Sequence, residues 1–150
     1  MPQQTLPDIR IMIAADLDQV LAIEQASFTT PWKREHFESE LSGSYSFPFV
    51  AEWNGNIVGY VCLTSLFEES QILDIAVAPT RRGNGVALVL MEYAVELARE
   101  KGADVLELEV RATNSAAISL YERLGFIRSG CRTNYYEGID DAVLMECKLK

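Results

Sequence analysis

The spacing of hydrophobic residues changes several times along the chain, and each change marks a new element. Apolar residues at helical spacing predict amphipathic helices over 16–28, 85–101 and 114–124. Thr30-Pro31 has the form of an N-cap followed by proline at the first helical position, which predicts another helix reaching about Leu41. Apolar runs typical of strands occupy 9–13, 47–53, 57–66, 72–77, 105–110, 126–135 and 142–149.

Short polar segments separate these elements. Asn54-Gly55-Asn56 is a hairpin signal between the second and third strands, and Glu68-Glu69-Ser70 separates the third strand from the fourth. Residues 79–85 form a turn-rich loop that contains two glycines. On the helix over 16–28, the predicted apolar face consists of Leu17, Val20, Leu21, Ile23 and Ala26.

The order of these elements predicts an α+β domain with a mixed central sheet of about seven strands and four helices. The strand over 72–77, the helix over 85–101 and the strand over 105–110 form a β-α-β unit, whose strands are expected to be parallel with a right-handed crossover. The 150 residues suffice for one globular core, and the chain shows no repeat or linker. We therefore predict a single domain over residues 1–150.

Composition narrows the classes of partner. A net charge of −9 argues against nucleic-acid binding, which needs a basic surface, and suits a cationic substrate such as an amine. No apolar stretch approaches the ~20 residues of a membrane span, and residues 1–10 lack a secretion signal, so a cytoplasmic location is expected. Cys62, Cys131 and Cys147 have no metal-like spacing and are interpreted as buried reduced thiols, with no metal bound.

A glycine-rich loop opens the helix over 85–101. Gly83 and Gly85 allow close approach of a ligand to the backbone, and a helix N-terminus presents unpaired N–H donors to a phosphate. Arg81 and Arg82 are placed to add charge-assisted contacts. Leu88 replaces the third glycine of a dinucleotide fingerprint, and no Gly-Lys-Ser/Thr follows. The residues alone allow two interpretations of this segment: a phosphate-binding loop, or an ordinary loop with two solvated arginines.

A second group of candidates follows in the next strand and helix. Glu107 and Glu109 alternate with apolar neighbours and therefore share one strand face, which the residues alone also explain as the solvent side of an edge strand. Tyr121 lies on the apolar face of its helix, where a core tyrosine is the alternative. Cys131 is a poor candidate acyl carrier, because the sole histidine, His36, is distant in sequence.

The glycine loop resembles that of the GNAT acetyltransferases. The run Arg82-Gly83-Asn84-Gly85-Val86-Ala87 matches the pattern Gln/Arg-x-x-Gly-x-Gly/Ala, and the resemblance extends over the whole chain. It implies the acyl-CoA N-acyltransferase fold, in which the parallel strand pair is splayed, and acetyl-CoA as co-substrate. It also implies that the Val77 N–H polarises the thioester carbonyl. The implied acetyl-CoA contacts are Ile75, Ala76, Val77, Arg82, Gly83, Asn84, Gly85, Val86, Ala87, Leu88 and Asn114.

Other runs resemble one branch of this family, the bacterial ribosomal-protein-alanine acetyltransferases. These runs are 23–28 with Pro31-Trp32, 108–114, 117–126, 132–136 and 140–145, although Asp140 stands where relatives often carry glutamate. This resemblance implies Glu109 as general base and Tyr121 as general acid. Trp32, Tyr135 and Tyr136 are candidates for a substrate groove, with core packing as the alternative.

The implied reaction is acetyl transfer to the N-terminal α-amine of a protein, with the alanine of a small-subunit ribosomal protein as the expected acceptor. Two alternatives remain from the sequence: a GNAT enzyme that acts on small amines or lysine side chains, and a non-catalytic acyl-CoA-binding module. The sequence makes no prediction of oligomeric state.

Overall fold

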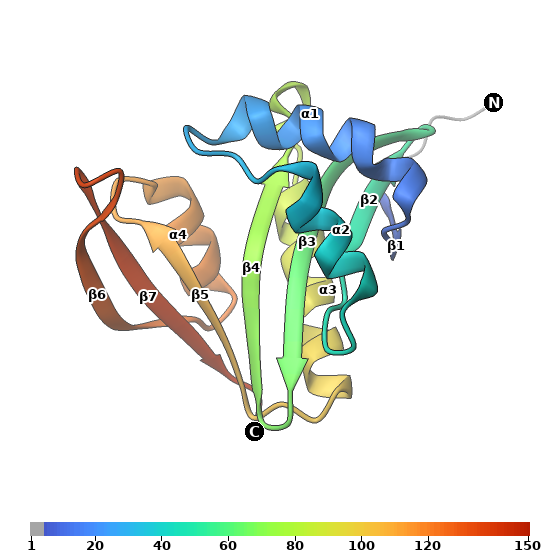
Figure 1. Ribbon diagram of the computed structural model, residues 1–150. Helices are drawn as coiled ribbons and strands as arrows, with labels where there is room; N and C mark the ends of the chain where they lie inside the picture. Colours follow the sequence, from blue (N-terminus) through green and yellow to red (C-terminus); the bar gives the residue numbers. More distant parts are fainter. Residues whose placement is uncertain (1–4) are drawn as a thin grey trace. The chain divides into compact units, whose positions relative to one another are not determined.

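The computed structural model describes residues 5–150, and its elements follow the predicted order (Figure 1). The strands are β1 (Asp8–Ile11), β2 (Phe49–Trp53), β3 (Asn56–Leu66), β4 (Glu69–Val77), β5 (Val105–Arg111), β6 (Ile127–Tyr136) and β7 (Asp140–Lys148). The helices are α1 (Leu17–Ser27), α2 (Arg34–Ser42), α3 (Val86–Glu100) and α4 (Ser115–Arg123), with short 3-10 turns η1 (Ala14–Asp16) and η2 (Pro79–Arg81).

Among the described residues, the strands form one seven-stranded mixed sheet in the order β1-β2-β3-β4-β5-β7-β6. β4 and β5 are parallel, which confirms the predicted β-α-β unit, whereas β7 runs antiparallel to both β5 and β6. The β4–β5 ladder pairs residues 69–71 with residues 105–107 and stops well before β4 ends at Val77. The parallel pair is therefore splayed, as the fold class requires.

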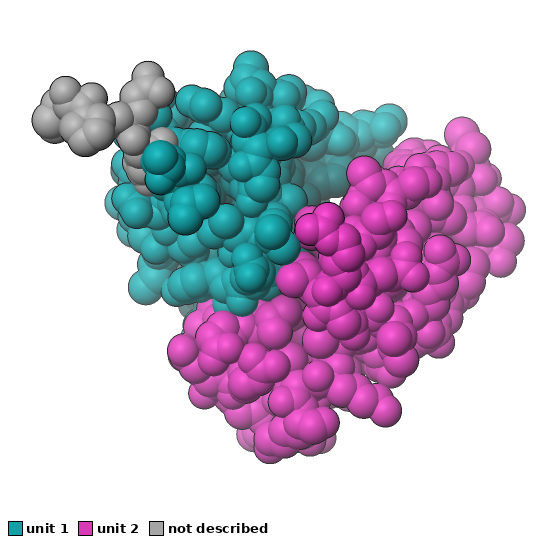
Figure 2. Space-filling model, turned by 180° about the vertical axis from the view of Figure 1, so that it is seen from behind, with its two compact units in different colours: residues 1–64, 74–94 teal, residues 65–73, 95–150 magenta. Residues whose placement is uncertain are grey.

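Contacts along the chain group into two compact units, which Figure 2 shows in different colours. Unit 1 comprises residues up to 64 together with 74–94, and unit 2 comprises residues 65–73 together with 95–150. Both units are built from more than one chain segment. The expectation of a single domain over residues 1–150 remains a prediction.

Unit 1 is layered around β2 and β3. α1 and α2 cover one face of these strands, and the first turns of α3 cover the other (Figure 1). Neighbouring residues of β3 show the two faces: Tyr60 contacts Phe37 of α2, and Gly59 lies against Leu90 of α3. The core under α1 and α2 is formed by Met12, Leu17, Val20, Ile23, Phe37, Val50, Ile57, Tyr60, Cys62 and Ala76.

Unit 2 has its own core around β5, β7 and α4. Leu106 and Leu108 of β5 are buried, as is Met145 of β7. The rings of Tyr121 and Phe126 pack at 5.9 Å between centroids where α4 ends. β5 lies between β4 and β7, so the interpretation of β5 as an edge strand is wrong, although Glu107 is exposed and Glu109 half-buried.

The hairpin between β2 and β3 turns at Asn54-Gly55, as predicted. Both residues have positive φ, 52° and 84°, and Trp53 pairs with Asn56. Positive φ at both central positions is the geometry of the tight hairpin turn that asparagine and glycine favour.

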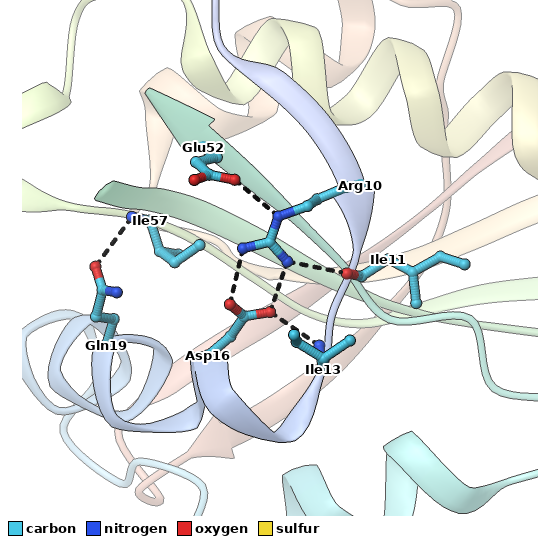
Figure 3. Close-up of polar contacts among 7 residues, drawn as sticks. All are labelled: Arg10, Ile11, Ile13, Asp16, Gln19, Glu52 and Ile57. Carbon is cyan, nitrogen blue, oxygen red and sulfur yellow. Dashed lines mark hydrogen bonds and ion pairs between the residues drawn. The ribbon is translucent and has the colours of Figure 1, made fainter. Parts of the chain in front are cut away.

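An ion-pair network fixes the chain where it enters α1 (Figure 3). Arg10 of β1 donates two hydrogen bonds to Asp16, both of 2.9 Å, and a third of 2.8 Å to Glu52 of β2. Asp16 also accepts the backbone N–H of Ile13 at 2.8 Å. Arg10 holds the pKa of Asp16 below its usual value, because the hydrogen bonds stabilise the carboxylate. The network ties η1 to the sheet.

The second helix begins later than predicted. α2 begins at Arg34, and residue 33 is extended, so Thr30-Pro31 is not its start. The backbone N–H of Trp32 donates to the Glu24 carboxylate at 2.8 Å, and that of Lys33 donates to Nδ1 of His36 at 3.0 Å. These side-chain acceptors hold the segment before α2 in an extended form that the proline signal does not reveal.

Three smaller expectations are wrong. The turn after β3 is at 67–68 rather than 68–70, and Phe67 adopts a φ of 55° there. Ala26 is exposed, whereas Glu24 of the same helix is buried. Cys62 and Cys147 are buried as expected, but Cys131 is exposed because it lies on the edge strand β6.

Candidate active site

The glycine loop in unit 1 has the conformation that its sequence predicts. Gly83 and Gly85 have φ values of 81° and 80°, in the left-handed region that favours glycine, and α3 begins at Val86. A Cβ atom added at either glycine would meet nothing within 4 Å. Open space therefore borders the loop backbone where the free N–H groups of a helix N-terminus are expected.

Side chains of the loop hold it in place. Arg82 donates to the Val77 carbonyl oxygen at 3.3 Å and to the Ser27 hydroxyl at 3.0 Å, so it links the loop to β4 and to α1. Asn84 Nδ2 donates to the Arg81 carbonyl oxygen at 3.1 Å. The interpretation of Arg82 as a merely solvated side chain is therefore refined: it is exposed, but its hydrogen bonds hold the loop in place.

The remaining residues expected to contact acetyl-CoA in unit 1 flank this loop. Ala76 faces the core, whereas Ile75 and Val77 are half-buried on the opposite face of β4. In the first turn of α3, Val86 is buried and its two successors, Ala87 and Leu88, are half-buried. The strand, loop and helix therefore form one continuous segment with its loop backbone exposed.

Glu109 of β5 anchors a cluster of charged and aromatic residues in unit 2. Its side chain is 19% exposed and forms an ion pair of 3.2 Å with Arg132 of β6, whose side chain is 55% exposed. The Arg132 guanidinium also lies over the ring of Tyr135, at 5.3 Å from the centroid. The candidate base thus lies next to a cation that the sequence analysis did not assign to the site.

Tyr136 connects Glu109 with Tyr121. Burial raises the pKa of Tyr136, and the nearby Glu109 carboxylate raises it further. Burial also raises the pKa of Tyr121 to about 12, with a smaller contribution from Tyr136. Tyr121 therefore keeps its phenol proton at neutral pH. The structure brings Glu109, Tyr121, Tyr135 and Tyr136 into one neighbourhood of unit 2.

Asn114 has a structural duty besides its expected cofactor contact. It is the N-cap of α4, and its Oδ1 accepts the backbone N–H of Ala117 at 3.2 Å.

The three candidates for substrate binding differ in exposure. In unit 1, Trp32 is half-buried and stacks on His36, with ring centroids 5.6 Å apart, while it packs against the core. Tyr135 is exposed and Tyr136 half-buried. The roles of Trp32, Tyr135 and Tyr136 in substrate binding remain predictions.

Three polar residues with notable surroundings were not predicted to have a role. Arg132 stands in one of the runs that carry the family resemblance, so its position was available as a signal. Glu24 and Asp74 are buried in unit 1 although they are acidic. Within residues 5–150, no group of three or more potential metal ligands is present, and no helix is long and apolar enough to cross a membrane.

Comparison with known proteins gives consistent matches along the chain. A model of the acetyltransferase (GNAT) family matches residues 17–126. A Bacillus subtilis protein, provisionally named a [ribosomal protein bS18]-alanine N-acetyltransferase, is 38% identical over 144 residues, which cover 95% of each chain. The [ribosomal protein bS18]-alanine N-acetyltransferase of Escherichia coli K12 is 35% identical over 133 residues, covering 87% of this chain and 89% of that protein.

A solved structure agrees with these sequence matches. The crystal structure of the ribosomal-protein-S18-alanine N-acetyltransferase from Escherichia coli superposes with a TM-score of 0.90 at 32% identity. The match covers 97% of this chain and 95% of that one.

Proposed function

We propose that this chain, which belongs to the acetyltransferase (GNAT) family, acetylates the N-terminal alanine of ribosomal protein bS18. The family match and the names of the relatives make it an acetyl-CoA-dependent N-acetyltransferase. The acceptor, the catalytic residues and a cytoplasmic place of action are the proposed parts. The acceptor is supported by relatives that match nearly the full length of the chain.

The glycine loop fits the pyrophosphate of acetyl-CoA. Open space borders Gly83 and Gly85, and the backbone of residues 83–88 leads directly into α3. Exposed N–H groups at such a helix start suit a phosphate group. Residues 75–77 would hold the pantetheine arm, with the Val77 N–H directed to the thioester carbonyl. Asn114 stays a predicted contact of acetyl-CoA. Bound acetyl-CoA supplies an acyl group activated as a thioester.

Glu109 acts as the base in this proposal. Only a neutral amine attacks a thioester, and an α-amino group with a pKa of about 8 is roughly one-tenth neutral at pH 7, against well under a thousandth of a lysine side chain. A carboxylate that accepts the amine proton, directly or through water, therefore suffices for an N-terminal acceptor. The small exposure of Glu109 leaves it accessible to such a proton.

Tyr121 acts as the acid. Its phenol is buried, which raises its pKa to about 12 and keeps the proton available at neutral pH. The departing coenzyme A thiolate accepts this proton, because its conjugate thiol has a pKa of about 8.5 and is mostly protonated at neutral pH. The observation that carries the proposal is the shared neighbourhood of Glu109 and Tyr121 around Tyr136, which supplies one base and one acid.

Acetylation of defined peptides tests the proposal. A peptide with the alanine-initiated sequence of bS18 is incubated with acetyl-CoA and analysed by mass spectrometry, beside the same peptide with a blocked N-terminus and an internal lysine. We expect acetyl only on the free N-terminus. Acetylation of the blocked peptide alone would identify a lysine acetyltransferase, and free coenzyme A without any acetylated amine would refute the acceptor.

Two conservative variants test the catalytic roles. Glu109→Gln and Tyr121→Phe keep the shape of each side chain but remove its proton chemistry. We expect turnover to fall by about 10²–10⁴-fold in each, the usual contribution of a general acid or base. Acetyl-CoA binding, measured by calorimetry, should stay unchanged. Full turnover in both variants would contradict the assignment.

A further inference from the structure

Two acidic side chains meet in the core of unit 1. Glu24 of α1 is 1% exposed and Asp74 of β4 is 8% exposed, and both contribute to a region lined by the buried Tyr60 of β3. Carboxylates are seldom buried to this degree without a cation, because desolvation of the charge is costly. Within residues 5–150, neither Glu24 nor Asp74 forms an ion pair with a lysine or arginine, whereas Asp16 in the same unit pairs with Arg10.

Glu24 carries the charge of the pair. Its Oε1 accepts the Tyr60 hydroxyl at 2.5 Å and its Oε2 accepts the backbone N–H of Trp32 at 2.8 Å. A short O–H···O contact is typical of a hydroxyl that donates to a carboxylate. Burial, together with the hydrogen bond to the Glu24 carboxylate, raises the pKa of Tyr60, so this hydroxyl stays a donor. Glu24 therefore ties the segment between α1 and α2 to β3.

Asp74 carries the proton. No described donor reaches its buried Oδ2, and its carboxyl lies within hydrogen-bonding range of Glu24. Burial, and then Glu24, raises the pKa of Asp74 well above its usual value, while the Ile75 N–H offsets a part of this rise. Protonation of Asp74 gives its buried oxygen a hydrogen-bonding partner, because the resulting hydroxyl donates to the Glu24 carboxylate. Without this proton, two negatively charged carboxylates would lie within hydrogen-bonding range and repel each other.

We propose that Glu24 and protonated Asp74 form a one-proton pair that positions Trp32 for the acceptor peptide. Glu24 grips the Trp32 backbone, and Asp74 supplies the hydrogen bond that keeps Glu24 in place. Asp74 is a positioning residue in this arrangement. The proposal rests on the proposed function, because it assigns the segment around Trp32 to acceptor recognition.

The proposal predicts a pH effect on acceptor binding. Loss of the shared proton places two negative charges together and weakens the hold of Glu24 on Trp32. The other titratable groups around the pair are Tyr60 and Cys62 of β3 and Glu40 of α2. A thiol and a carboxyl group are either neutral or negative, so neither Cys62 nor Glu40 adds a positive charge that would relieve the repulsion. Burial raises the pKa of both groups.

Asp74→Asn removes the titratable proton at position 74 but keeps a hydrogen-bond donor there. An amide at position 74 donates to Glu24 at every pH and has no proton to lose in this range. We compare the acceptor KM of wild type with that of Asp74→Asn as a ratio. Titration of the acceptor amine affects both KM values equally and therefore does not change this ratio. We expect this ratio to be about one at pH 7 and to rise about threefold or more at pH 9.5, because apparent affinity falls with the competent fraction. Asp8→Asn, an exposed change of the same type, should leave the ratio flat.

Glu24→Gln provides the second variant. A glutamine has a single acceptor oxygen and cannot serve both Tyr60 and Trp32, so acceptor KM should rise about tenfold at all pH values with kcat within about threefold. Infrared spectroscopy of the acetyl-CoA complex supplies a readout independent of activity. A protonated-carboxyl band at pH 7 should be present in wild type and absent in Asp74→Asn.

Each outcome of these measurements decides the proposal. An absent carboxyl band in wild type, or a pH-independent KM ratio, would overturn the one-proton pair even if the bS18 peptide is acetylated normally. A band that Asp74→Asn removes would support the shared proton even if the acceptor proved to be another amine, in which case the role of Trp32 in peptide binding would be overturned.

Discussion

Gly59 of β3 offers a sharp test of how the sheet supports the glycine loop. A Cβ atom at this position would lie 2.9 Å from Cδ1 of Leu90, 3.0 Å from the carbonyl oxygen of Ala76 and 3.2 Å from Cγ1 of Val86. Leu90 and Val86 are both buried, so neither side chain can move outward without disturbing its neighbours. The Ala76 contact is with backbone of β4, in the stretch proposed to hold acetyl-CoA.

The expected magnitude follows from two opposing effects of Gly59→Ala. Overpacking of a dense core costs about 1–3 kcal/mol, and the lower backbone entropy of alanine in the unfolded chain returns about 0.5–1 kcal/mol. We therefore expect a loss of about 0–2.5 kcal/mol in the free energy of unfolding, measured by urea denaturation. A shift of the Ala76 carbonyl and of the start of α3 should also weaken acetyl-CoA binding by about threefold to tenfold in calorimetry, which is about 0.6–1.4 kcal/mol.

Gly55→Ala is the matched control. Gly55 has a φ of 84°, so alanine is strained there and costs about 1–2 kcal/mol, yet its added Cβ meets nothing within 4 Å. This variant should lose comparable stability and keep its affinity for acetyl-CoA. If Gly59→Ala were as stable as wild type and bound acetyl-CoA equally well, the reasoning from close packing would be refuted.

Three further predictions concern single sites. Asn114→Ala should lose about 0.5–2 kcal/mol of stability with the α4 cap, whereas Asn114→Asp should keep the cap and raise only the KM for acetyl-CoA, as denaturation and kinetics would show. Asp16→Asn should cost about 1–3 kcal/mol, since the carboxylate accepts charged hydrogen bonds from Arg10. Because Arg10 lowers the pKa of Asp16, this contribution is complete above the unfolded value of about 3.9 and lost as pH falls through the folded-state pKa, measurable by denaturation at several pH values. Thiol labelling followed by mass spectrometry should modify the exposed Cys131 in the native protein but Cys62 only after unfolding, and early labelling of Cys62 would contradict its burial.

Most of the fold was predictable because its signals are local. The change from alternating to helical spacing places α3 and α4 nearly at their observed bounds, and Asn54-Gly55 identifies its hairpin from backbone preferences alone. The candidate site was only partly predictable from local signals. Gly83 and Gly85 adopt the conformation that their residue type favours, whereas the ion pair of Glu109 with Arg132 joins two strands that pair only through β7.

The sequence by itself determined the order of elements, the glycine loop at the start of α3 and the residues that carry the family resemblance, because each of these depends on neighbours within a few positions. Only the tertiary structure decided the environment of the polar side chains. Glu24 follows a helical pattern like any exposed glutamate, and its burial against Tyr60 and Asp74 arises when α1 packs onto β3 and β4. The late start of α2 has the same origin, since a carboxylate eight positions earlier captures the N–H of Trp32. Hydrogen bonds between segments distant in sequence leave no trace in local periodicity, so only the folded chain reveals them.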